Sequence, residues 1–477
     1  MERIEVLPEQ LYRHWESYRE CFTTRTRDNS EYAYQYLRGQ LTMDKDRNYA
    51  GIARATEGKD GQAMQHFMSN SPWSGQRVYQ RIQEDIRLVP RLAHDSLLIL
   101  DESADEKADI HSAGAARQYN GRFGKVDTCQ VSVVLGYANW KSGPWTTWAL
   151  VDSELFLTEG WFTPDFVLER RQLGVPLERG FQTKPELGLE MIRRAKTQGL
   201  PFEAVACDDL YGRDGQFRAT LDDEEITYFV DVPANTRVYL KRPQIGVPEK
   251  TVAKGRPKKK RQVLNESRSL RVDQVGKKAD TTWQRLLIRH NERGVLEDDF
   301  AARRVWTWRQ GPGEAREEWL IIRVERNGDH SYTLSNAPTD MPLEGLAEGA
   351  CGRYFVERVI QDAKDETGWD EFQAQKYLGW EHHTALTACA LWFIAQTKLA
   401  WTEDVAQDPT LARQLEVDVL PALSTANVRE MLKAVLPLPQ FSPQAAREQV
   451  IKHLVNRSRS TASRLRHRHR KVVNVQT

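Results

Sequence analysis

Three acidic residues stand in sequence contexts that could bring them together at one site. Asp101 follows the apolar run 96–100, and Asp208 follows a second apolar run at 202–207. Such runs predict buried strands, which would place both carboxylates at strand ends. Glu357 lies in the stretch 353–364, which is typical of a helix. Carboxylate oxygens gathered in this way suit Mg²⁺, and two such ions can activate an attacking oxygen and stabilise a leaving one during phosphodiester cleavage.

The helix that carries Glu357 also carries two basic residues in register with it. Arg353 lies four residues before Glu357, and Lys364 lies seven residues after it. Eleven residues make about three helical turns, so the three side chains share one face. An acid between two bases fits a metal ligand flanked by phosphate contacts. The spacing by itself favours a simpler interpretation, a solvated face with an Arg–Glu ion pair.

Three segments in chain order resemble the motif blocks of DDE transposases. They are Leu100-Asp101-Glu102-Ser103, the segment 207–212 that begins Cys-Asp-Asp, and Arg353 with Glu357 and Lys364. The group with the strongest resemblance is the bacterial insertion-sequence transposases with a β-strand insertion between the second Asp and the Glu. Its signature around the last carboxylate is Tyr, Arg, Glu, Lys; here the Tyr position is Ala350, and Tyr354 follows the Arg. The segment 121–133 also resembles the loop and second strand of these enzymes, and the resemblance spans about residues 40–390.

This resemblance implies a mixed α/β fold with an RNase H-like core. It implies a cut-and-paste transposase in which Asp101, Asp208 and Glu357 hold two Mg²⁺ ions, with Mn²⁺ as a substitute. The substrate would be double-stranded DNA, both terminal inverted repeats and target, and a homodimer would join the two ends. Arg353, Lys364 and Lys125 would contact phosphates. The strand containing Trp319 resembles the one that carries a Trp receiving a flipped base during hairpin formation.

Other carboxylates compete for the metal-ligand role. The rivals are Asp105, Asp209, Asp214 and Asp362. We choose Asp208 over its neighbour Asp209 because the Tyr-Gly pair starts three residues after Asp208, which matches the family spacing. Asp109 and His111, or His382 and His383, could suggest zinc, but adjacent histidines on a helix point about 100° apart and chelate one ion poorly.

A protein of a different class would show many of the same features. A non-catalytic, regulatory DNA-binding protein descended from a transposase would keep the fold and the basic surfaces. The absence of a Tyr at position 350 favours this alternative, and the intact set of three carboxylates argues against it.

Charge is balanced overall but unevenly distributed. The formal net charge of +1 says nothing about partners. Basic residues concentrate at 241–262, which includes Lys258, Lys259, Lys260 and Arg261, and again at 457–471. Such blocks attract phosphate, although each could also be a solubilising segment. Tryptophans near the first block (Trp283, Trp306, Trp308 and Trp319) could stack on unpaired bases or pack a small core.

The lack of a recognisable targeting signal and the pattern of cysteine usage lead us to expect a bacterial cytoplasmic protein. We expect it to associate with the nucleoid when it acts. The five cysteines are scattered without C-x-x-C spacing, as expected of free thiols in a reducing compartment. The N-terminus lacks a signal-peptide core, and we expect no transmembrane helix and no membrane partner.

The pattern along the chain predicts five regions. Residues 1–90 would form a helical DNA-binding domain, 91–235 the first part of the catalytic core, and 236–337 a β-strand insertion domain. Residues 338–400 would form the last helical part of the core, which carries the Glu, and 401–477 a helical C-terminal region with a basic tail. We expect core strands at 95–100, 127–137, 145–155, 202–207 and 228–232, a helix at 186–197, insertion strands at 282–289, 304–309 and 318–324, and a helical pattern from 345 to about 400.

Overall fold

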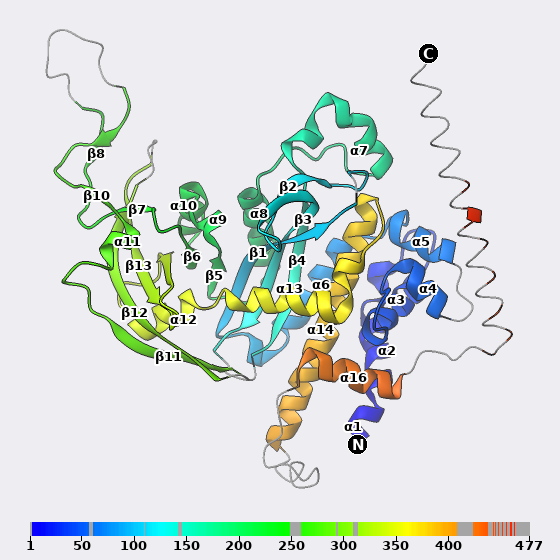
Figure 1. Ribbon diagram of the computed structural model, residues 1–477. Helices are drawn as coiled ribbons and strands as arrows, with labels where there is room; N and C mark the ends of the chain where they lie inside the picture. The colour runs from blue at the N-terminus through cyan, green and yellow to red at the C-terminus, as the bar shows by residue number, and fades with distance from the viewer. Residues whose placement is uncertain are drawn as a thin grey trace.

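The computed structural model describes most of the chain. It covers residues 2–56, 61–108, 110–141, 146–248, 259–291, 294–308, 313–407 and 423–436, with isolated positions beyond 441. The fold is mixed α/β: one large sheet runs through the molecule, and helices pack on it and at one end (Figure 1). None of the described helices combines the length and the apolar composition that crossing a membrane requires.

The sheet begins with two antiparallel pairings and continues with two parallel ones. Its first strands are β1 (Ser96–Glu106), β2 (Ala116–Asn120), β3 (Lys125–Asn139), β4 (Trp148–Phe156), β5 (Ala204–Cys207) and β6 (Tyr228–Asp231). β3 lies antiparallel between β4 and β1, and β2 extends β3 as a hairpin. β1 pairs parallel with β5, and β5 pairs parallel with β6. The order is therefore β4–β3–β1–β5–β6, and the predicted strands in this region are all present.

Four helices lie among the residues described in this part of the chain. They are α7 (Val167–Leu173), α8 (Lys184–Thr197), α9 (Asp209–Gly212) and α10 (Gly215–Asp223), with 3-10 turns at Glu159–Phe162 and Pro164–Phe166. Helix α8 starts with a capping box between Thr183 and Glu186. Gly188 lets it approach the sheet, because a Cβ there would lie 2.3 Å from Leu100 Cδ2. Leu100 thus faces α8, and the alternation of a strand turns its neighbour Asp101 to the opposite face.

The helices after the insertion include one that packs directly on that opposite face. They are α12 (Leu343–Ala350), α13 (Tyr354–Thr367), α14 (Tyr377–Gln407) and α16 (Thr425–Val435), with a 3-10 turn at Trp369–Glu371. Val356 and Val359 of α13 pack over Gly136 of β3, which pairs with Ile99, two residues before Asp101. The predicted helical stretch from 345 to 400 is broken twice: at 351–353, and at Gly368, whose φ of 72° ends α13 in a left-handed residue.

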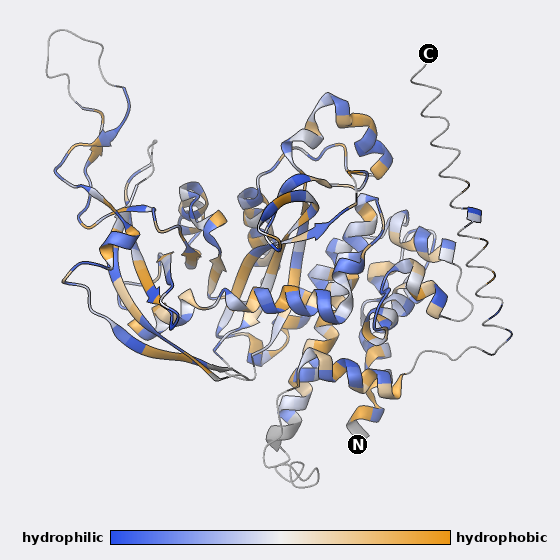
Figure 2. Ribbon diagram, viewed as in Figure 1, coloured by the Kyte–Doolittle hydropathy of each residue, from blue (hydrophilic) through white to orange (hydrophobic). Residues whose placement is uncertain are grey.

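The N-terminal segment is helical, as predicted, and surrounds α14. Its helices are α1 (Glu2–Glu5), α2 (Leu7–Ser17), α3 (Ser30–Thr42), α4 (Tyr49–Ala55), α5 (Gly61–Ser69) and α6 (Gly75–Arg87), with 3-10 turns at Arg19–Phe22 and Pro90–Leu92. Helix α14 is apolar around much of its circumference, and residues such as Leu386 and Trp392 are fully buried. Figure 2 shows this apolar interior shared by the helices and the central strands.

The insertion continues the central sheet. It contains β7 (Arg237–Tyr239), β8 (Ile245–Gly246), β9 (Gln262–Val263), β10 (Ser269–Arg271), α11 (Val272–Val275), β11 (Gln284–Asn291), β12 (Gly294–Thr307), β13 (Arg316–Val324) and β14 (His330–Ser335). β14 pairs antiparallel with β6, so the insertion strands other than β8 and β9 form one sheet of twelve strands with the core strands, while β8 and β9 pair with each other. The three predicted insertion strands are present, and β14, which the sequence pattern did not reveal, makes the connection.

Candidate active site

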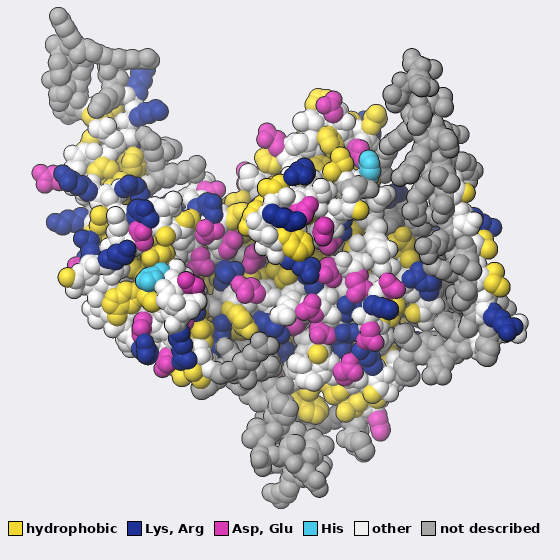
Figure 3. Space-filling view, viewed as in Figure 1, with side chains coloured by type: hydrophobic (Ala, Val, Ile, Leu, Met, Phe, Trp, Pro, Cys, Tyr) yellow, Lys and Arg dark blue, Asp and Glu magenta, His cyan; other side chains and the backbone are white. Residues whose placement is uncertain are grey.

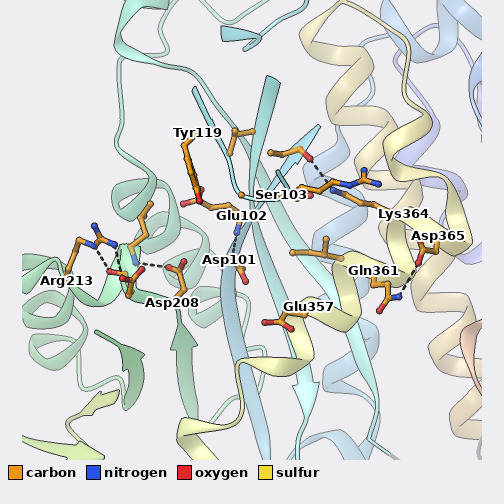
Figure 4. Close-up of a pocket in the computed structure, with 17 residues that line it drawn as sticks. Asp101, Glu102, Ser103, Tyr119, Asp208, Arg213, Glu357, Gln361, Lys364 and Asp365 are labelled. Atoms are coloured by element: carbon orange, nitrogen blue, oxygen red, sulfur yellow. Dashed lines mark hydrogen bonds and ion pairs between the residues drawn. The ribbon is translucent and has the colours of Figure 1, made fainter. Parts of the chain in front are cut away.

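The structure brings Asp101, Asp208 and Glu357 to one cleft. Figure 4 shows their side chains on three different elements, facing the same hollow. Further charged and polar side chains line the cleft. Its lining includes Glu102, Ser103, Tyr119, Arg122, Asp209, Arg213, Gln361, Lys364 and Asp365. Figure 3 shows acidic side chains gathered around the centre of this face. The cleft is thus rich in carboxylates, with basic groups at its margin.

Asp101 does not end its strand, contrary to the prediction. β1 continues to Glu106, paired with β3 throughout. The parallel pairing on its other side stops when Leu100 meets Cys207, the last residue of β5. Beyond Leu100, β5 no longer pairs with this edge of β1, and the cleft opens there. Asp208 follows β5 directly and caps helix α9, because its Oδ1 accepts a hydrogen bond of 3.0 Å from Leu210 N.

Burial disfavours the charged form of Asp101 and of Asp208. It raises the pKa of Asp101 to about 7, and Asp208 nearby adds to this, while Arg353 opposes it. Burial likewise raises the pKa of Asp208. Buried carboxylates that repel one another favour a cation between them. Their hard oxygen atoms match the preference of Mg²⁺, so the residues present fit this ion.

In this arrangement a guanidinium takes the position of the cation. Arg353 Nη1 lies 3.3 Å from Asp101 Oδ2, its Nη2 lies 2.9 Å from Glu357 Oε1, and its Nε lies 3.3 Å from Asp231 Oδ2. Among the residues that the structure describes, no three aspartate, glutamate, histidine or cysteine side chains are grouped closely enough to hold a metal ion. Metal binding would therefore require Asp101 and Glu357 to exchange their arginine partner for the ion.

Of the remaining predicted phosphate contacts, Lys364 lines the cleft and Lys125 does not. Lys364 lines it, and its Nζ donates to Ala104 O at 3.2 Å. Lys125 is exposed at the start of β3, 3.1 Å from Asp127, and is not among the residues that line the cleft. Tyr354 is 38% exposed, and the guanidinium of Arg289 stacks on its ring at 4.2 Å.

The rival carboxylates have partners of their own. Asp209 lines the cleft but pairs with Arg213 at 2.9 Å, and Asp105 pairs with Lys107. Asp214 caps α10. Asp362 accepts hydrogen bonds from Trp148 Nε1 and Thr425 Oγ1, at 2.9 and 2.6 Å.

The histidines considered for zinc are engaged elsewhere. His382 and His383 are buried in α14, and each shares hydrogen bonds with main-chain oxygens, of Met68 and Trp73 and of Trp369 respectively. His111 lies 3.3 Å from Glu169, and Asp109 is outside the described residues.

Trp319 and the basic run lie in the insertion, away from the cleft lining. Trp319 is half-buried; its Nε1 donates to Pro338 O at 3.1 Å, and Arg304 lies over its ring at 5.1 Å. Lys259 and Lys260 are exposed beside β9, and Arg261 pairs with Glu314. Lys258 and nearly all of the 457–471 block fall outside the described residues.

Sequence reasoning missed one charged residue of the site, Asp231. It ends β6, and the pattern of an apolar run followed by Asp is present there, since Tyr228-Phe229-Val230 precede it. The same signal had pointed to Asp101 and Asp208. Only the parallel pairing of β6 with β5 shows that Asp231 reaches the same edge of the sheet.

A mixed sheet with a cleft lined by carboxylates is the arrangement expected of a metal-dependent nuclease. Comparison with known families identifies the family. The chain belongs to the DDE superfamily of endonucleases: residues 17–295 match the model of that family. This range contains Asp101 and Asp208 and ends before Glu357. The chain is also 25% identical, over 351 residues, to the probable transposase for insertion sequence element IS701 of Microchaete diplosiphon. The alignment covers 72% of this chain and 77% of that relative. The predicted resemblance to insertion-sequence DDE transposases is confirmed.

A solved structure with an overall similarity is the cryo-EM structure of the piggyBac transposase synaptic complex with hairpin DNA. It is 12% identical, and the match covers 95% of this chain and 87% of that one. A TM-score of 0.32 does not establish a shared fold.

Proposed function

We propose that this protein is a cut-and-paste DNA transposase that cleaves insertion-sequence ends and transfers the cut strand into target DNA. The observation that carries the proposal is the convergence of Asp101, Asp208 and Glu357 on one cleft in a member of the DDE endonuclease superfamily. The substrate would be double-stranded DNA, first the terminal inverted repeats and then the target, in the cytoplasm of a bacterium. A homodimer would hold the two ends together.

We assign the catalytic core to the RNase H-like class. The strand order β4–β3–β1–β5–β6, with three antiparallel strands followed by parallel ones, supports this assignment. The proposed division is 1–90 for helical DNA binding, 91–235 and 338–400 for the core, 236–337 for the insertion and 401–477 for the C-terminal region.

Asp101, Asp208 and Glu357 would hold two Mg²⁺ ions, with Mn²⁺ as a substitute. When bound, the ions supply an activated oxygen nucleophile and stabilise the leaving oxygen. The chain's own groups do the rest. Lys364 lines the cleft, and Arg353 contacts two of its carboxylates, Asp101 and Glu357; both would supply positive charge to position phosphates. Lys125 would extend this contact along the DNA. The 3′-hydroxyl freed by the first cut would become the nucleophile of the next transfer.

A strand-nicking assay tests the function directly. Purified protein is incubated with a duplex that carries the element's terminal repeats, with Mg²⁺, with Mn²⁺ or with EDTA. We expect nicks at the repeat end that depend on the ion. Binding to the repeats without nicking under all ion conditions would favour the alternative, a regulatory DNA-binding protein derived from a transposase.

Trp319 provides a test of the later steps. If a base leaves the stack when a strand folds back on itself, an aromatic ring must replace the lost stacking, worth about 1–3 kcal/mol per base. Trp319→Ala should leave first-strand nicking near normal and slow the next step about tenfold to a hundredfold, and Trp319→Phe should be milder. Gel analysis of nicked and hairpin products measures both steps.

Trp283→Ala is the matched control, because Trp283 is an exposed tryptophan of the same insertion. Melting temperature is measured in parallel. If Trp319→Ala lost about 3–5 kcal/mol of stability and every DNA step failed together, Trp319 would be core of the insertion. A stable variant with unchanged hairpin yield would remove Trp319 from the mechanism.

The basic run predicts a salt effect. Figure 3 shows Lys and Arg side chains gathered over the insertion strands. Lys259 and Lys260 of the basic run are both exposed. Replacing Lys258, Lys259, Lys260 and Arg261 with Ala should weaken DNA binding. The slope of log affinity against log salt should flatten by about 0.9 unit for each phosphate that the protein no longer neutralises. Arg285→Ala is the control, because Asp299 already neutralises that exposed arginine at 3.0 Å. An unchanged slope would make the run a solvated linker.

A further inference from the structure

Three aspartates stand level across three adjacent parallel strands. Leu100 of β1 pairs with Cys207 of β5, and Cys207 pairs with Val230 of β6. The residues that follow them are Asp101, Asp208 and Asp231. Neighbours in register on parallel strands point to the same face, so the third aspartate reaches the face on which the cleft opens. Asp231 nevertheless has a different set of partners from the other two.

The two carboxylate oxygens of Asp231 have different partners, a threonine hydroxyl and an arginine. Its Oδ1 accepts a hydrogen bond of 2.7 Å from Thr333 Oγ1 of β14. Its Oδ2 lies 3.3 Å from Nε of Arg353. The Thr333 hydroxyl therefore sets the orientation of the carboxylate, and β14 belongs to the insertion. The insertion thus contributes to the placement of an arginine that contacts two carboxylates of the cleft.

The guanidinium of Arg353 divides its contacts between two kinds of carboxylate. Its terminal nitrogens Nη1 and Nη2 contact Asp101 and Glu357, which are proposed metal ligands. Its Nε edge contacts Asp231, which is not. If Asp101 and Glu357 bound a divalent ion, the terminal nitrogens would lose these two partners, whereas the pairing of Nε with Asp231 would be retained. A planar guanidinium held along one edge presents its other nitrogens in a fixed fork that matches a phosphate.

We propose that Asp231 is a positioning residue that anchors Arg353 by its Nε edge, so that the terminal nitrogens stay beside Asp101 and Glu357 and bind a DNA phosphate when these two residues hold metal. This inference rests on the proposed function. Asp231 contacts neither DNA nor the reacting atoms; it acts through Arg353. Thr333 supports it by holding the carboxylate in position.

The sign of the change in DNA affinity tests this role. A carboxylate near DNA repels phosphate, so Asp231→Asn should tighten binding if Asp231 acts only through its charge. If Asp231 anchors Arg353, the same substitution should weaken binding about three- to tenfold, the range expected when one hydrogen bond to the DNA is removed. Affinity is measured on a terminal-repeat duplex with Ca²⁺ in place of Mg²⁺, and a gel verifies that the DNA remains intact.

A double-mutant cycle isolates the action through Arg353. In an Arg353→Ala background, Asp231→Asn should no longer weaken binding and should tighten it slightly, because only the charge effect is left. Thr333→Val keeps the charge but frees the carboxylate, and should weaken binding in the same direction as Asp231→Asn. Asp231→Glu should restore part of the loss. Asp299→Asn is the matched control, since it removes an exposed acid paired with an arginine elsewhere in the insertion.

Two outcomes would overturn the inference: tighter binding by Asp231→Asn, or an equal effect of this substitution with and without Arg353. Circular dichroism and melting temperature show whether each variant is folded. If Asp231→Asn does not fold, Thr333→Val and Asp231→Glu still test the inference. Failure of the proposed function would appear separately, as metal-independent or absent nicking by the unmodified protein, because the binding cycle requires no cleavage.

Discussion

Replacing Asp208 or Asp101 with Ala is expected to abolish strand cleavage while binding to terminal-repeat DNA survives. Each substitution removes oxygen ligands from the proposed metal site. We expect a loss of at least about 10²–10³-fold in nicking rate, the scale seen when one group that stabilises transition-state charge is removed. DNA affinity should hold or rise slightly, because a carboxylate contributes nothing attractive to phosphate. Single-turnover nicking and equilibrium binding measure the two effects on one duplex.

The matched control is Asp209→Ala. Asp209 lies next to Asp208 and lines the same cleft, but its carboxylate is half-exposed and pairs with Arg213 at 2.9 Å. We expect this variant to cleave nearly as well as the unmodified protein. Normal cleavage by Asp208→Ala together with loss of cleavage by Asp209→Ala would show that the second ligand is assigned to the wrong residue. Glu357→Ala should behave like the aspartate variants if the third ligand is correct.

The second large effect is expected in stability, at a buried carboxylate that ties the insertion to the core. Glu318 of β13 is almost fully buried. Its Oε1 accepts from Arg218 Nε at 3.0 Å and from Tyr228 OH at 2.7 Å, and its Oε2 accepts from Thr307 Oγ1. Glu318→Ala would leave the buried Arg218 charge without its partner. Breaking a buried pair in this way costs about 3–5 kcal/mol.

Urea denaturation followed by circular dichroism measures this loss. Glu317→Ala is the control: Glu317 is the adjacent residue, but it is exposed and pairs with Arg304 at 3.2 Å, and exposed pairs contribute about 0–1 kcal/mol. Equal midpoints for the two variants would contradict the prediction. Arg218 also donates to the carbonyl of Gly212 at the end of α9. Since Asp208 caps that helix, we expect Glu318→Ala to reduce cleavage as well.

Local sequence determined most of the elements that carry the site. The apolar runs before Asp101 and Asp208 predicted buried strands, and both are present as parts of β1 and β5. The helix around Glu357 was also predicted and is present as α13. These features depend on hydrophobic periodicity and on residues near in sequence, and for that reason a single chain displays them without its fold. The motif order added the family, which the match over residues 17–295 bears out.

Strand lengths and the joint with the insertion were predicted less well. The pattern placed Asp101 at a strand end, yet β1 extends to Glu106 because β3 pairs with it beyond the end of β5. The pattern predicted a β-strand insertion domain but not how it joins the core, and the pairing of β14 with β6 makes that connection. Hydrogen-bonding partners distant in sequence decide both features, and a periodicity in one segment does not specify which strand will pair with it.

The sequence by itself therefore determined which carboxylates could lie at the carboxyl edge of buried strands and which helix could bring a third. Tertiary structure alone decided that Asp231 lies level with them and that Arg353 is shared among Asp101, Asp231 and Glu357. The reason is physical. Strand and helix formation respond to burial patterns along the chain, whereas the partner of a charged side chain depends on which distant segments the sheet register places within about 4 Å of it.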